Sequence, residues 1–191
     1  QTETQLTIYA ATKKANENMA HSYSNLWKIP TTMLRFFTVY GPWGRPDMAL
    51  FKFVEAILNN KPINIYNNGE MKRDFTYIED IVKGIRLLID QIPNNLANIT
   101  KLECDSLSPV APYRVVNIGN SKTIKLLDFI KAIEDTLGKK AIRNYLGMQK
   151  GDVKSTLSDI TLLQKLTNYS PQVNYKEGIA KFIEWYKDYY V

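Results

Sequence analysis

A tyrosine and a lysine stand four residues apart in the opening stretch of the chain, QTETQLTIYAATKKANE. In a helix this spacing puts Tyr9 and Lys13 on one face, so the phenol and the ammonium can share a site. A nearby ammonium favours the phenolate and lowers the pKa of a tyrosine from about 10 toward the range of a general base. An ordinary surface pair has the same spacing, and the spacing alone does not separate the two readings.

A second stretch, LRFFTVYGPWGRPDMALFKF, carries further side chains with chemical potential. It overlaps the β-branched and aromatic run TTMLRFFTV, which predicts a buried strand over residues 31–39 that ends at the breaker-rich GPWGRPD. Such a strand delivers Thr38 and Tyr40 to its carboxyl end, where open α/β sheets bind ligands, and the following turn presents Arg45. Taken singly, these residues are more typical of a plain strand, a turn and a surface cation.

The spacing of apolar residues predicts the elements that must hold these side chains in place. We expect helices over residues 9–27, 50–58, 77–89, 126–137 and 179–186. We expect strands over residues 31–39, 62–66, 72–76 and 113–119. The second and third strands, with NNGE between them, are expected to form a hairpin or another paired excursion. Alternating strands and helices imply a parallel sheet, with too few strands here for a complete doubly wound domain.

The composition is that of a soluble globular protein, and no apolar run approaches the roughly 20 residues of a membrane span. The single Cys104 excludes a disulfide framework, which favours a reducing cytoplasm. The net charge of +6 suits an anionic ligand, a nucleic acid or a solvated surface, and the scattered lysines favour the last. Aromatic and basic residues do not interleave as in RNA-binding proteins, and His21 has no metal-ligand partner at a suitable spacing. We therefore expect no nucleic acid, no membrane and no metal.

Five stretches in one order carry a resemblance to a known family. They are YAATKKANE, RFFTVYGPWGRPDMALFKF, YNNGEMKRDFTYIEDIV, VVNIGN and MQKGDV. Together they resemble the nucleotide-sugar epimerases of the extended short-chain dehydrogenase/reductase family, most of all the UDP-glucuronate 4-epimerases, over nearly the whole chain. Thr38 carries the finer assignment, because most relatives have Asn at that position and the glucuronate epimerases have Thr.

The resemblance implies an α/β fold: the C-terminal part of a Rossmann-type parallel sheet, with a smaller α/β substrate-binding domain. Residues 1–46 would end the dinucleotide-binding domain. Residues 47–191 would form mainly the nucleotide-sugar-binding domain, with one strand and helix at about 77–92 returning to the Rossmann core. The family's glycine-rich dinucleotide turn and catalytic Ser/Thr are not found in this sequence. Residues 1–191 alone are therefore expected to fold poorly and not to retain NAD.

The resemblance also implies a role for the opening pair. Tyr9 would remove the proton of the sugar 4-hydroxyl as hydride passes from C4 to NAD⁺, and the transient 4-keto sugar would take the hydride back on its other face. Lys13 would hold the nicotinamide ribose and keep Tyr9 acidic. Phe36 and Phe37 join these two residues as the expected cofactor contacts.

Substrate contacts follow from the same resemblance. Thr38 would meet the sugar carboxylate through its hydroxyl, and Arg45 and Arg73 would bind the UDP diphosphate, which guanidinium groups suit. Arg73 has an alternative interpretation as an ion pair with Asp74 or Glu79. The other expected substrate contacts are Met48, Phe51, Ile65 and Tyr66 around the uracil, and Gln149 and Asp152 in MQKGDV.

Some of these residues have another interpretation, and so has the function. Phe51 fits the core face of a helix equally well, and Gly147 and Lys150 stand where relatives commonly have proline. The leading hypothesis is conversion of UDP-glucuronate to UDP-galacturonate for surface polysaccharide, by a homodimer that uses the helix at 9–27 in a four-helix bundle. The alternatives are a UDP-hexose or UDP-N-acetylhexosamine 4-epimerase, a dehydratase or decarboxylase of the same family, and a non-catalytic nucleotide-sugar-binding fragment.

Overall fold

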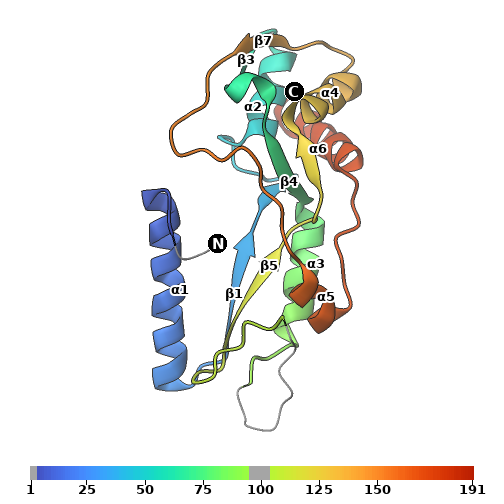
Figure 1. The fold of residues 1–191 in the computed structure, drawn as a ribbon. Helices are drawn as coiled ribbons and strands as arrows, with labels where there is room; N and C mark the ends of the chain where they lie inside the picture. Colours follow the sequence, from blue (N-terminus) through green and yellow to red (C-terminus); the bar gives the residue numbers. More distant parts are fainter. Residues whose placement is uncertain (1–3, 95–103) are drawn as a thin grey trace.

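The computed structural model describes residues 4–94 and 104–191 and has a mixed α/β architecture (Figure 1). Its elements in chain order are α1 (Ile8–Trp27), β1 (Thr31–Phe36), β2 (Thr38–Tyr40), α2 (Ala49–Leu58), β3 (Pro62–Ile65), the 3-10 turn η1 (Tyr66–Gly69), β4 (Lys72–Tyr77), α3 (Ile78–Ile89), β5 (Tyr113–Ile118), β6 (Thr123–Lys125), α4 (Leu126–Leu137), β7 (Ile142–Tyr145), α5 (Thr161–Thr167) and α6 (Tyr175–Tyr190). None of the helices in these ranges combines the length and the apolar character that a bilayer crossing demands.

The strands pair mainly in parallel, as expected from the alternation of strands and helices. β1 pairs with β5, β2 with β4 and β3 with β7, while β6 runs antiparallel to β4. The single strand predicted over 31–39 is divided at Phe37, where the chain leaves β5 and joins β4. One strand-like segment therefore serves two sheets, and Thr38 begins the second of them.

The predicted hairpin around NNGE is wrong. β3 pairs with β7 and β4 pairs with β2 and β6, so the two strands do not pair with each other. Asn67 and Asn68 both adopt left-handed backbone conformations with φ of 49°, inside a 3-10 turn. This turn carries the chain away from β3, and Leu146 donates its N–H to the Ile65 carbonyl on the β7 side at 2.9 Å.

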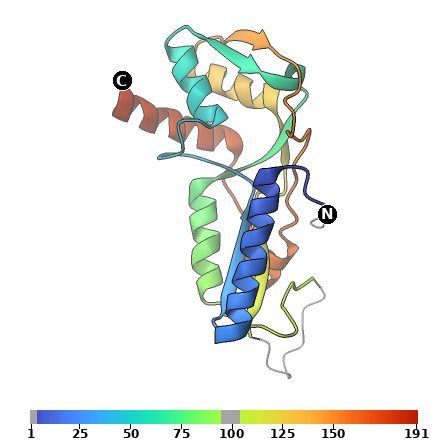
Figure 2. The ribbon, with the colours of Figure 1, turned by 90° about the vertical axis from the view of Figure 1, so that its left-hand side faces the viewer.

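Two apolar clusters support the fold. The larger lies between α2, β4, α4 and α6, where the rings of Phe75 and Phe129 stack at 4.0 Å between centroids. The smaller joins α3, β5 and α5 through residues such as Ile81, Val116 and Leu163. In Figures 1 and 2 the β1–β5 pair stands between α1 on one side and α3 with α5 on the other. The larger cluster forms the part of the molecule that carries α2, β3 and β7.

A buried carboxylate on α4 binds two basic side chains, Lys140 and Arg143, that follow the end of that helix. α4 ends as predicted at Gly138, in a left-handed conformation with φ of 66°. Glu134 is only 3% exposed and accepts hydrogen bonds from the Ala141 N–H, the Arg143 guanidinium and the Lys140 ammonium. Burial alone would raise the pKa of Glu134, but these hydrogen bonds outweigh burial and lower the pKa from its ordinary value of 4.5.

We predict that Glu134→Gln lowers the free energy of unfolding at about pH 7 by roughly 2 kcal/mol, because the hydrogen bonds to a charged acceptor are lost. A carboxyl whose folded pKa is depressed stabilises the protein above its unfolded pKa, and this contribution fades as the pH falls toward the folded pKa. The deficit of the variant should therefore shrink below pH 4.5. Urea denaturation over a pH series measures it.

The matched control is Asp135→Asn at the next position. The Asp135 side chain is 59% exposed and lies 4.0 Å from Lys140, so its loss should change stability by less than about 0.5 kcal/mol. A deficit for Glu134→Gln that is the same at about pH 3.5 and about pH 7 would contradict the assignment.

Candidate active site

The opening pair lies on the first turns of α1. The helix begins where the Thr7 hydroxyl accepts a hydrogen bond from the Ala10 N–H at 3.1 Å, an N-cap arrangement. Lys13 Nζ lies 5.5 Å from the centroid of the Tyr9 ring, and both side chains are exposed, Tyr9 at 72%. The structure therefore brings the two groups together, open to a ligand, as their spacing indicates.

The two phenylalanines expected at the cofactor lie at the carboxyl end of β1. Phe36 is its last residue and is 48% exposed, and Phe37 connects β1 to β2. α1 packs against β1 in the opposite direction, so its first turn lies toward the same end of the molecule as Phe36 (Figures 1 and 2). The four residues thus gather toward one end of the α1–β1 layer.

A cleft of about 690 Å³ brings together most of the expected substrate contacts. Its walls come mainly from α2, β3, β4 and the turn that holds Gln149 and Asp152. Six of the nine predicted residues line it, namely Thr38, Met48, Tyr66, Arg73, Gln149 and Asp152. The cleft also includes Lys52 and Lys61, which sequence reasoning missed. Lys52 lies one helical turn after Met48, so helical spacing was a signal that could have found it.

An ion pair crosses one wall of this cleft. Arg73 Nη2 donates to Asp152 Oδ1 at 2.7 Å, and the two side chains are 17% and 34% exposed. Arg73 therefore pairs with Asp152, and not with Asp74 or Glu79 as the alternative interpretation has it. Strand alternation explains this choice, because Asp74 points into the interior while its neighbour on β4 points into the cleft.

Arg45 lies near the cleft residues Thr38 and Met48 and near the Tyr9 phenol. Its guanidinium forms an exposed ion pair with Asp47, with Nε donating to Oδ1 at 3.0 Å. That hydrogen bond raises the pKa of Arg45, and the nearby Tyr9 phenol acts in the same direction. Arg45 also lines a small cavity of about 50 Å³ with Thr38, Met48 and other residues.

Two predicted contacts belong to the apolar interior. Ile65 is completely buried, and Phe51 is 6% exposed and packs its ring against Tyr186 and Phe182 at 5.1 and 6.1 Å between centroids. Phe51 also borders the small cavity beside Arg45. The core interpretation of Phe51 is therefore correct for most of its side chain, and Ile65 lies wholly in the interior and does not line the cleft.

The turn that carries Gln149 and Asp152 reaches the beginning of α1. Gly151 has a left-handed φ of 82°, and a Cβ added there would lie 3.1 Å from the Thr7 methyl group. A closed turn forms here, in which Asp152 donates its N–H to the Gln149 carbonyl at 3.3 Å. Because Thr7 caps the helix that bears Tyr9, the turn that supplies Gln149 and Asp152 to the cleft lies close to the start of that helix.

The arrangement suits an anionic ligand that extends from a partly buried guanidinium to an exposed phenol and ammonium. Guanidinium groups pair with phosphate oxygens, and a phenol beside a lysine can move a proton. Within residues 4–94 and 104–191, no cluster of three His, Cys, Asp or Glu side chains is placed to hold a metal ion.

Known proteins are similar to this chain in sequence and in the arrangement of its elements. The family model described as "NAD dependent epimerase/dehydratase family" matches residues 1–100. A probable UDP-glucuronate 4-epimerase of Rhizobium meliloti (strain 1021) is 52% identical over 97% of this chain and 54% of its own length. UDP-glucuronate 4-epimerase 4 of Arabidopsis thaliana is 42% identical over 99% of this chain and 43% of its own length.

A solved structure gives the same fold. The UDP-glucuronic acid 4-epimerase of Bacillus cereus, crystallised with UDP-glucuronic acid and NAD, matches 97% of this chain and 54% of its own, with a TM-score of 0.82 and 34% identity. The chain thus has a Rossmann-like mixed α/β fold and spans about half the length of the relatives it matches. Since the family model covers more than half of the 191 residues and includes α1, β1, β2, α2 and β4, the chain belongs to the NAD dependent epimerase/dehydratase family.

Proposed function

We propose that the complete protein carrying this chain is a UDP-sugar 4-epimerase that interconverts UDP-glucuronate and UDP-galacturonate. The observation that carries the proposal is the close approach of Gly151, in the turn that lines the cleft through Gln149 and Asp152, to Thr7 at the start of the helix of Tyr9 and Lys13. A ligand with a diphosphate at Arg73 and a sugar near Tyr9 fits this joined site. The glucuronate epimerases among the relatives support the choice of sugar.

NAD is the cofactor that this proposal requires. The residues fit its nicotinamide end, because Tyr9 and Lys13 are exposed on one helix face and the half-exposed Phe36 is the last residue of β1, which ends toward the first turn of that helix. NAD, when bound, supplies the hydride acceptor and donor for C4 of the sugar. Lys13 would donate hydrogen bonds to ribose hydroxyls, and its ammonium lies beside the Tyr9 ring. Tyr9 takes the proton from the 4-hydroxyl and later returns it.

The cleft holds the nucleotide in this proposal. Arg73 and Arg45 bind the diphosphate, and the ion pair with Asp152 keeps the Arg73 guanidinium oriented before the ligand arrives. Met48 and Tyr66, which line the cleft, enclose the uracil together with the turn at Gln149. The buried Phe51 and Ile65 contribute by supporting the wall of the cleft from behind.

Thr38 meets the sugar carboxylate. It is half-buried at the start of β2, where it lines both the cleft and the small cavity beside Arg45. Burying a hydroxyl group costs less free energy than burying a charged group, and the hydroxyl can still donate a hydrogen bond to a carboxylate oxygen. Neutral UDP-hexoses and UDP-N-acetylhexosamines have no carboxylate for this hydroxyl, and the decarboxylases and dehydratases of the family use the same scaffold for other reactions.

The proposal extends to domains and assembly. Residues 1–46 would complete a dinucleotide-binding domain, and residues 47–191 would mainly bind the nucleotide sugar, with 77–92 packed on the Rossmann core. A homodimer would cover the exposed apolar side chains on the later turns of α1, which include Met19, Tyr23 and Trp27. We place the enzyme in the cytoplasm, in the synthesis of surface polysaccharide.

The first test replaces the proposed base. In the complete protein, Tyr9→Phe should lower the rate of UDP-glucuronate epimerisation by about 100-fold to 10,000-fold, since general-base catalysis contributes that much. Proton NMR of the sugar H4 signals measures the rate. UDP affinity, measured by calorimetry, should change little because Tyr9 lies outside the cleft.

Tyr189→Phe is the matched control, since Tyr189 is 59% exposed on α6 and does not line the cleft. It should keep the full rate. An undiminished rate for Tyr9→Phe in a protein that epimerises UDP-glucuronate would remove the proposed role of the phenol.

The second test concerns the sugar. Thr38→Val keeps the β-branched shape on β2 and removes only the hydroxyl, which is worth roughly 1.5 kcal/mol when it bonds a charged group. The variant should therefore lose about tenfold in kcat/KM for UDP-glucuronate and much less for UDP-glucose. Parallel assays of the two substrates measure the ratio, and an equal loss on both would speak against a uronate contact at Thr38.

A further inference from the structure

We propose that Glu17 is a positioning residue, whose ion pair with Arg35 sets the rotation of α1 about its axis and so aims Tyr9 and Lys13 at the substrate. The inference rests on the proposed function, because it concerns the pair that would carry the reaction. Glu17 itself touches neither the cleft nor the Tyr9 ring. Its effect would pass through the helix.

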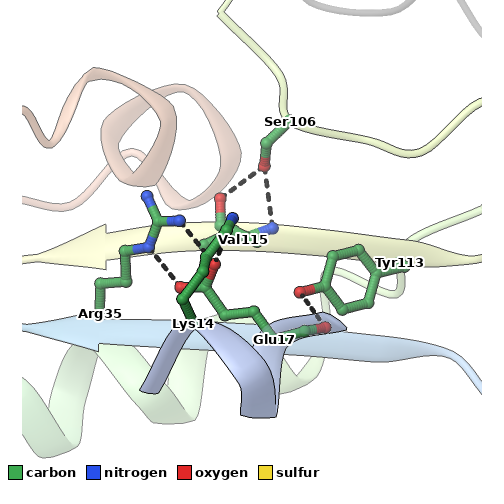
Figure 3. A network of polar contacts seen from close by, with 6 residues as sticks. All are labelled: Lys14, Glu17, Arg35, Ser106, Tyr113 and Val115. Carbon is green, nitrogen blue, oxygen red and sulfur yellow. Dashed lines mark hydrogen bonds and ion pairs between the residues drawn. The ribbon is translucent and has the colours of Figure 1, made fainter. Parts of the chain in front are cut away.

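The ion pair is bidentate and mostly shielded from solvent. Arg35 Nε donates to Glu17 Oε1 at 2.6 Å and Arg35 Nη2 to Oε2 at 2.7 Å (Figure 3). The Glu17 side chain is 12% exposed and that of Arg35 33%. Lys14 Nζ adds a third hydrogen bond at 3.1 Å from the exposed side. A fork-to-fork pair fixes orientation as well as distance, which a single contact does not.

A second strand holds the same point of the helix. The Tyr113 hydroxyl on β5 donates to the main-chain carbonyl of Glu17 at 3.1 Å (Figure 3). A residue of β1 therefore binds the side chain of Glu17, and a residue of β5 binds its main-chain carbonyl. One residue of α1 is thus tied to both members of the β1–β5 pair.

Apolar packing does little to fix the helix within the described residues. Only Ser24 of α1 is buried, while several large apolar side chains of the helix are more than half exposed: Ile8, Tyr9, Met19, Tyr23, Leu26 and Trp27. Besides the contacts at Glu17, a hydrogen bond of 2.8 Å joins His21 to Ser108. Polar contacts near the middle of α1, at Glu17 and His21, therefore set its rotation.

The position of Glu17 suits this task. Tyr9, Lys13 and Glu17 are four residues apart in turn, so their side chains fall within an arc of about 80° on the helix surface. A rotation of about 20° would move a side-chain tip some 6 Å from the axis by about 2 Å. A misplacement of about 1 Å at a reacting group can cost about 100-fold in rate.

The ion pair also links the catalytic helix to the substrate strand. Arg35 directly precedes Phe36, and Thr38 begins β2 three residues later. The same contact that orients Tyr9 therefore places α1 against the strand end that delivers the proposed cofactor and carboxylate contacts. Loss of the pair would disturb their mutual placement while leaving the Arg73 wall of the cleft in place.

Glu17→Gln in the complete, NAD-loaded protein tests the proposal. With kcat normalised to the folded fraction measured by circular dichroism, it should lower kcat for UDP-glucuronate by about 10-fold to 100-fold and leave KM and UDP affinity within about twofold. Arg35→Gln should give the same loss. The double variant should lose no more than either single variant, because both changes remove one interaction. Lys14→Met is the control: it removes a partner of Glu17 but keeps the Arg35 pair, and should keep full activity.

A second readout does not depend on activity. Spin labels at Thr12→Cys on α1 and Arg86→Cys on α3, in a Cys104→Ser background, report their distance distribution by pulsed EPR. Glu17→Gln should broaden or shift this distribution, and Lys14→Met should not. If the unaltered protein fails to epimerise UDP-glucuronate, the proposed function falls and the EPR result alone decides the role of Glu17. An unchanged distribution, or a kcat that falls only with the folded fraction, would overturn the inference.

Discussion

The carboxylate of Asp74 is the contact on which the arrangement of the cleft depends. It is fully buried, and it accepts hydrogen bonds from the main-chain N–H groups of Asn120, Ser121 and Ser158 at 2.8 to 3.0 Å. These donors take the place of the water molecules that the carboxylate loses on burial. The carboxylate thereby ties β4 to the segment after β5 and to the segment that follows the 147–152 turn. Because strand residues alternate, the same β4 geometry sends Arg73 outward into the cleft.

The remaining parts of the site extend from this fixed centre. The 147–152 turn brings Asp152 to Arg73 and Gly151 to the start of α1, so the cleft and the exposed phenol and ammonium share one boundary. At Phe37 the chain leaves the sheet of β1 and β5 and joins the sheet of β2 and β4. Thr38 therefore lies beside β4, while Arg35 remains in β1. A nucleotide held in the cleft and a sugar presented to Tyr9 therefore depend on the same few contacts.

The sequence predicted the long elements well because their apolar spacing is strong. The helices around 9–27 and 126–137 and the strand at 113–119 agree with α1, α4 and β5 within about a residue at each end. β7 was missed because its four residues are all exposed and show no alternation. The hairpin prediction failed because two consecutive left-handed asparagines turn the chain away, and propensity does not reveal the strand that β3 finally joins.

Site residues could be predicted where they lie inside an ordered motif. The stretches that carry Thr38, Met48, Arg73 and Asp152 led to residues that the fold brings into one cleft. Their partners could not be foreseen, since Asp152 is 79 residues from Arg73 along the chain and Arg35 is 18 from Glu17. Such pairings follow from tertiary packing, which spacing within a single stretch does not encode.

The central claim is that one ligand occupies both ends of this site, with its nucleotide in the cleft and its sugar at the opening pair. Hydrogen–deuterium exchange of the complete protein with UDP, and then with UDP-glucuronate, tests it directly. UDP should slow exchange in the first turn of α2 and in residues 147–152 and leave residues 4–12 unchanged, and UDP-glucuronate should add slower exchange in residues 4–12. Equal exchange in residues 4–12 with both ligands, or no effect of UDP on residues 147–152, would contradict the account.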